Sequence, residues 1–234
     1  MKNLCIERVD SWYTDENISG AKILTMPNIP RPLHGRNPRT IMGSAGWDAM
    51  RTSCYKKAKY TCEACGKKLL HPQAHELYSI SYVEGTQKFI RCVCLCDLCH
   101  KGVHSGHAVT DYLNGKITKE ELFDIVENVF RLVSEHNELN KNSKPLKVYA
   151  AFLRCLKIPE LRDDVSALIE EYNIEFYKER ISRSASWSDW HLVFGNALFG
   201  PLYKTYSDWF NSRGSGRKLR SYVIFSNNYA MRVA

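Results

Sequence analysis

Two pairs of cysteines have the spacing of a zinc site. Cys62 and Cys65 form one C-x2-C pair, Cys96 and Cys99 form another, and thirty residues separate the pairs. A gap of two residues lets both sulfurs of a pair face one ion, and four thiolates satisfy a tetrahedral zinc. The spacing therefore predicts a structural zinc that holds two distant segments together.

The remaining cysteines are expected to stay thiols. Cys92 and Cys94 alternate with Val93 on an expected strand, a spacing that suits packing, although these two could rival the second pair as zinc ligands. The total of nine cysteines is odd, so intramolecular disulfides cannot use all of them. The start of the chain lacks the apolar stretch of a signal peptide, and no run approaches the roughly 18 apolar residues that span a bilayer. We therefore expect an intracellular, cytoplasmic protein without a membrane partner.

Two histidines follow the second cysteine pair in the segment HKGVHSGH. His100 and His104 are four residues apart, so they share one face if a helix starts at the cysteine pair. Two imidazoles on one helical face can bind a metal ion. This spacing predicts a second metal site next to the zinc.

The segments YTCEACG, AHELYSI and LCDLCHKGVHSGH resemble the HNH endonuclease family, in the form with a C-x2-C pair on each side of the active site. The resemblance covers roughly residues 36–136. It implies a ββα-metal fold, in which a strand or loop bears a catalytic histidine, a second strand follows, and a helix supplies metal ligands. His75 matches the first family position, and His100 with His104 matches the helix ligands.

The resemblance implies hydrolysis of a phosphodiester by a metal ion and a general base. In this reading His75 is the base, and His100 and His104 bind a catalytic divalent metal, magnesium or manganese, with zinc as a further candidate. The family commonly has Asp or His as a third ligand before the base, where this chain has Ala74. Either Glu76 replaces that ligand, or His75 is itself the ligand and Glu76 is the base.

The family's middle asparagine, which orients the base, has no clear counterpart here. Gln87 is the nearest amide, and Arg91 could instead contact phosphate. The formal net charge of +8 at pH 7 favours polyanionic partners. Basic residues before and within the metal module are expected to bind a nucleic-acid backbone, DNA being the leading candidate. These residues are Arg39, Arg51, Lys56, Lys57, Lys59 and Arg91.

Hydrophobic spacing predicts the elements that would position these side chains. A short helix is expected from Trp47 to Tyr60, and strand-like pieces are expected at 75–82 and 88–94. A longer helix should run from Thr118 to about residue 136, because Thr118 and Glu121 make a capping box before an apolar face.

We expect an α+β protein in three parts. Residues 1–35 would be a basic extended arm, 36–137 a zinc-stapled ββα-metal (HNH) domain, and 148–234 a mainly helical C-terminal domain. That last domain would end in a basic loop at 213–220 and two strands within 221–233. The competing function is a non-catalytic zinc module that binds nucleic acid or protein. A homodimer would supply two active sites for cutting both DNA strands.

Overall fold

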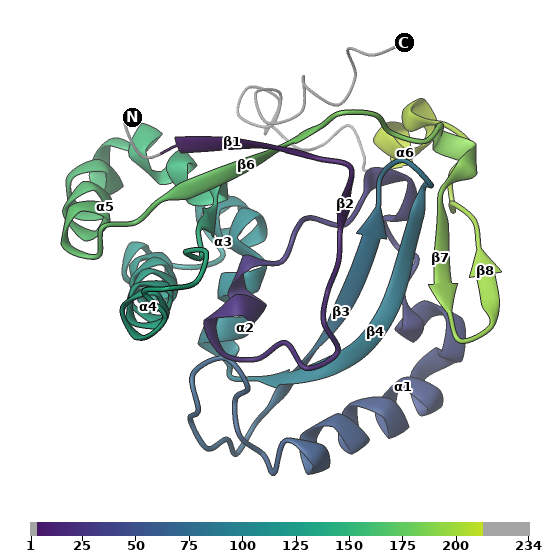
Figure 1. The fold of residues 1–234 in the computed structure, drawn as a ribbon, viewed down its shortest axis with the longest axis horizontal. Coiled ribbons are helices and arrows are strands. Elements are labelled where there is room, and N and C mark those ends of the chain that lie inside the picture. The colour runs from purple at the N-terminus through teal and green to yellow at the C-terminus, as the bar shows by residue number, and fades with distance from the viewer. Residues whose placement is uncertain (1–3, 213–234) are drawn as a thin grey trace.

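A computed structural model describes residues 4–212, and these form a mixed α+β fold (Figure 1). One sheet has five strands in the order β2-β3-β4-β7-β8, and a second, all-parallel sheet has the order β1-β6-β5. The basic loop and the two strands expected beyond residue 212 lie outside the described residues. The strands are β1 (Leu4–Val9), β2 (Ser11–Trp12), β3 (Gln73–Ser81), β4 (Thr86–Leu95), β5 (Val148–Tyr149), β6 (Phe176–Ile181), β7 (His191–Phe194) and β8 (Ala197–Phe199).

The helices cover both faces of the long β3-β4 hairpin (Figure 1). The α-helices are α1 (Pro38–Lys57), α2 (Asp97–Val103), α3 (Ser105–Leu113), α4 (Lys119–Leu139), α5 (Pro159–Glu171) and α6 (Tyr206–Ser212). The 3-10 helices are η1 (Gly20–Thr25), η2 (Arg31–Leu33), η3 (Ala150–Lys157) and η4 (Trp187–Asp189). In residues 4–212 no helix combines the length and the apolar character that crossing a membrane requires.

The register of the β3-β4 hairpin decides which side chains face which helices. His75 lies opposite Val93, and Glu76 lies opposite Cys92. Because side chains alternate along a strand, His75 and Glu76 point to opposite faces of the sheet. Val93 belongs to the main core with α4, whereas Cys92 packs in a separate cluster with Trp47 of α1. His75 therefore faces the α2 and α4 side, and Glu76 faces the α1 side.

Helix α4 begins as its sequence predicts. The Thr118 hydroxyl accepts the Glu121 N–H at 3.2 Å, and the Glu121 carboxylate accepts the Thr118 N–H at 2.8 Å, which confirms the capping box. The predicted apolar face of this helix is buried in the main core. Its fully buried residues include Leu122, Ile125 and Phe130.

Segments before and after the hairpin share its cores. Ile23 and Leu24, in the stretch expected to be an extended arm, are buried with α4 in the main core, and β1 pairs in parallel with β6. Residues 148–212 contain four strands beside their helices, because β5 and β6 join β1, and β7 joins β4. These are pairings between distant segments, which local spacing does not reveal. Packing thus runs across the sequence boundaries expected near residues 35 and 137–148.

Candidate metal centres

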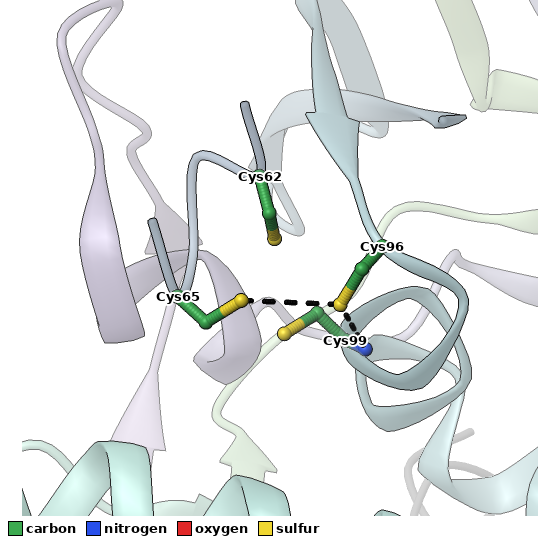
Figure 2. Close-up of side chains that lie close together, drawn as sticks. All are labelled: Cys62, Cys65, Cys96 and Cys99. Carbon is green, nitrogen blue, oxygen red and sulfur yellow. Dashed lines mark hydrogen bonds between the residues drawn. The ribbon is translucent and has the colours of Figure 1, made fainter. Parts of the chain in front are cut away.

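The four paired cysteines come together where the hairpin meets α2 (Figure 2). Cys62 and Cys65 lie in the turn after α1, Cys96 is the N-cap of α2, and Cys99 lies in the first turn of α2. Their four sulfur atoms all lie within 4.8 Å of one another. Such a set of four thiols could hold a structural metal such as zinc.

Local hydrogen bonds shape this cluster. The Gly66 N–H donates to the Cys62 carbonyl at 2.8 Å, and Gly66 adopts the positive φ of 77° that the turn requires. The Cys99 N–H donates to Cys96 Sγ at 3.4 Å, and Asn128 Nδ2 of α4 donates to Cys99 Sγ at 3.5 Å. Such donors stabilise thiolate ligands. Hydrogen bonds from the neighbouring thiols also lower the pKa of Cys62, which favours a thiolate in the cluster.

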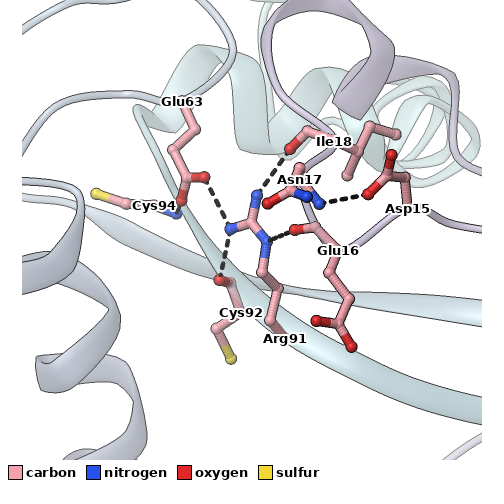
Figure 3. Close-up of polar contacts among 8 residues, drawn as sticks. All are labelled: Asp15, Glu16, Asn17, Ile18, Glu63, Arg91, Cys92 and Cys94. Atoms are coloured by element: carbon pink, nitrogen blue, oxygen red, sulfur yellow. Dashed lines mark hydrogen bonds and ion pairs between the residues drawn. The ribbon is translucent and has the colours of Figure 1, made fainter.

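Arg91 ties the first cysteine pair to β4 and to the N-terminal segment (Figure 3). Its guanidinium donates to the Glu63 carboxylate at 2.8 Å and to the carbonyls of Glu16 and Ile18, each at 2.7 Å. The other Glu63 oxygen accepts the Cys94 N–H at 2.9 Å. Arg91, one of the residues expected to contact phosphate, thus directs its donors to internal acceptors.

Replacing Arg91 with alanine is expected to lower the free energy of unfolding by about 2–3 kcal/mol, because it leaves the Glu63 carboxylate and two carbonyls without their donor. Side-chain exposures of 29% for Arg91 and 21% for Glu63 keep the expected loss below that of a fully buried pair. Urea unfolding of both single variants and of Arg91→Ala with Glu63→Gln gives the coupling energy. A loss under about 0.5 kcal/mol in Arg91→Ala would contradict this structural role.

Three histidines form a second cluster. His75 comes from β3, His100 lies within α2, and His104 is the residue between α2 and α3. One ring nitrogen of each lies within 4.8 Å of those of the other two. The ring centroids are 4.8 Å apart for His75 and His104 and 4.9 Å apart for His100 and His104. The spacing on α2 therefore brings both helix histidines to the one on the strand.

Burial keeps these imidazoles neutral. It lowers the pKa of His75 well below its ordinary value, lowers that of His100, and lowers that of His104 to about 4. His75 Nδ1 is buried and has no hydrogen-bond partner within residues 4–212. Neutral imidazoles offer lone pairs to a metal, and a set of three imidazoles suits zinc, cobalt or nickel better than magnesium.

The two clusters share the short helix α2. Cys96 caps this helix of seven residues, Cys99 and His100 are adjacent in it, and His104 ends it. Comparison of the chain with protein-family models, with curated proteins and with solved structures returned no match. Functional inference therefore starts from these two side-chain clusters.

Glu76 and Gln87 do not join the three histidines. Glu76 points to the other face of β3, where burial raises the pKa of its carboxyl and the charge of Arg39 lowers it. Gln87 is fully buried between Ile80 of β3 and Leu192 of β7, far along β4 from the His75 pair. The amide expected to be nearest the base thus lies away from the cluster.

Cys92 and Cys94 do not join the four paired cysteines either. Both side chains are buried on the α1 side of the hairpin with Cys54 and Trp47. Burial raises the pKa of Cys94 to about 11 and that of Cys54 to about 12, which keeps these groups as thiols. Strand packing is therefore their role, as the alternation predicts.

The basic residues of the α1 region fall into two groups. Arg39 is exposed in the first turn of α1, with its guanidinium carbon 4.8 Å from the centroid of the Trp47 ring. Arg51 pairs with Asp48 at 2.7 Å. The lysines lie exposed at the opposite end of the helix, beside the first cysteine pair. They are Lys56, Lys57 and Lys59.

Two contacts of these centres lie beyond the residues singled out from the sequence. Asn128 supports Cys99 from α4, and its position as a polar residue within the apolar stripe of Ile125 and Val129 is the signal that could have marked it. The stacking of Arg39 on Trp47 joins residues eight apart, a spacing that has no helical meaning.

Proposed function

We propose that this protein is a metal-dependent endonuclease of the HNH type that hydrolyses phosphodiester bonds in DNA. The observation that carries the proposal is the convergence of His75, His100 and His104 beside a four-cysteine cluster. They come from a strand and from the helix that follows the next strand, so β3, β4 and α2 would be the ββα-metal unit. The basic surface of the chain is consistent with a polyanionic substrate.

In this proposal the three histidines hold the metal and Glu76 is the general base. The support is that the ring of His75 lies with those of His100 and His104, as a third ligand would. Glu76 follows it directly on β3, and the charge of Arg39 acts on both Glu76 and His100, so both lie near the same guanidinium. Burial raises the pKa of Glu76, which makes its carboxylate a stronger base than an exposed one.

The donor set sets the expected metal. When bound, a divalent ion would polarise the phosphate and stabilise the leaving oxygen. Because the three grouped ligands are imidazoles with no carboxylate among them, we propose zinc or a similar transition metal rather than magnesium. The chain's own residues then orient the phosphodiester and accept the proton of the attacking water.

A plasmid-nicking assay with protein that retains its structural zinc tests the function. We expect nicking with added zinc, cobalt, nickel or manganese, and at least tenfold slower nicking with magnesium alone. His104→Ala should abolish nicking, whereas the control His107→Ala should retain it, because His107 is exposed and pairs with Asp111 instead. Equal nicking by His104→Ala and wild type would exclude the histidine cluster as the active site.

A non-catalytic zinc module is the second candidate. The burial of Gln87 away from the histidines favours it, because no other amide has been placed to orient a base. Binding of DNA in the same assay, without nicking under any metal, would select this second function.

A further inference from the structure

Helix α1 is broken near its start. Gly43 has φ 72° and ψ −178°, a conformation that is essentially restricted to glycine. A Cβ added at Gly43 would meet nothing within 4 Å, so the backbone conformation and not packing requires glycine there. The break separates residues 38–42 from the rest of the helix.

This break allows Arg39 to reach Trp47. Eight residues span about 12 Å along a straight helix, yet the Arg39 guanidinium carbon lies 4.8 Å from the centroid of the Trp47 ring. Trp47 is buried among the side chains that fill the space between α1 and β4, so its ring is fixed. The cation–π contact therefore holds the guanidinium in one place on the surface.

The charge of Arg39 is not neutralised by a neighbour. No carboxylate in residues 4–212 lies within ion-pair distance of it, whereas Arg51 on the same helix pairs with Asp48 at 2.7 Å. The Arg39 charge lowers the pKa of both Glu76 and His100, which places the guanidinium beside the histidine cluster. A fixed guanidinium with free donors suits the oxygens of a phosphate group.

We propose that Arg39, held on Trp47 by the break at Gly43, binds a non-bridging oxygen of the phosphate that lies at the histidine cluster. This inference rests on the proposed function and deepens it by naming the residue that receives the phosphate. In the hydrolysis, the water oxygen bonds to phosphorus and its proton goes to Glu76, while the bond to the leaving oxygen breaks and that oxygen takes a proton from solvent. Arg39 offsets the negative charge that grows on the phosphate oxygens.

Two measurements on the zinc-loaded full chain test the role of Arg39. Calorimetric titration with inorganic phosphate should show binding that Arg39→Ala weakens at least tenfold. Hydrolysis of bis(p-nitrophenyl) phosphate should fall by about 10² to 10³-fold in Arg39→Ala, with the metal content unchanged. Arg51→Ala is the matched control, because it removes the same charge from the same helix and should change neither result.

Gly43→Ala supplies a variant that keeps every charge. A Cβ at Gly43 strains the break, so phosphate affinity should fall although Arg39 is present. Phosphate binding that depends on Arg39 without any hydrolysis by the wild type would keep the anion site and reject the nuclease. Hydrolysis and phosphate binding that are equal in wild type and Arg39→Ala would overturn the role of Arg39 and leave the nuclease standing.

Discussion

Replacing Cys62 and Cys65 together with serine is expected to release the structural zinc and abolish cooperative unfolding. Zinc bound by such sites contributes roughly 10–16 kcal/mol in small peptides, which is comparable to the whole stability of a typical domain, about 5–15 kcal/mol. The loss should extend to the histidines. Helix α2 has seven residues, too few to be stable alone, and it carries Cys99 next to His100.

Elemental analysis and thermal unfolding followed by circular dichroism measure this effect. The wild type should hold zinc tightly and unfold in one transition, and the double variant should lose both properties. Cys54→Ser is the matched control, because Cys54 is a buried thiol outside the four-cysteine cluster and its loss should leave the zinc content unchanged. A double variant with full zinc content and an unchanged midpoint would disprove the four-thiolate site.

Glu76→Gln and His75→Ala are expected to lose cleavage for different reasons. Glu76→Gln should bind metal normally and cleave about 10² to 10⁴-fold more slowly, because it lacks the group that takes the proton of water. His75→Ala should lose a metal ligand, so a higher concentration of zinc or manganese should partly restore its activity. Metal titration of cleavage by the two variants separates the two defects.

The pH dependence of cleavage gives a second test of Glu76. A base must be ionised, and burial raises the pKa of this carboxyl above its ordinary value. Activity should therefore rise with pH as Glu76 ionises and be lost as pH falls through its raised pKa, a dependence that Glu76→Gln should lack. Metal rescue of Glu76→Gln but not of His75→Ala would assign the base to His75 instead, and full activity in both variants would exclude this site.

Short-range spacing in the sequence predicted the parts of this site that are local in the fold. The pairs Cys62 with Cys65 and Cys96 with Cys99 each lie in one turn, so a two-residue gap determines how their sulfurs face an ion. The capping box of Thr118 is equally local, because its partner is three residues away.

Tertiary structure decided what depends on distant segments. The sequence left His75 as base or ligand, and the pairing of β3 with β4 determines that its ring meets His100 and His104 while Glu76 faces α1. Arg91 resembled a phosphate contact, yet its acceptors include carbonyls about 75 residues earlier in the chain. The unusual backbone of Gly43, and with it the position of Arg39, likewise has no local signature. Spacing specifies geometry only within a turn or a helix, whereas the face and partner of a side chain follow from long-range pairing and packing.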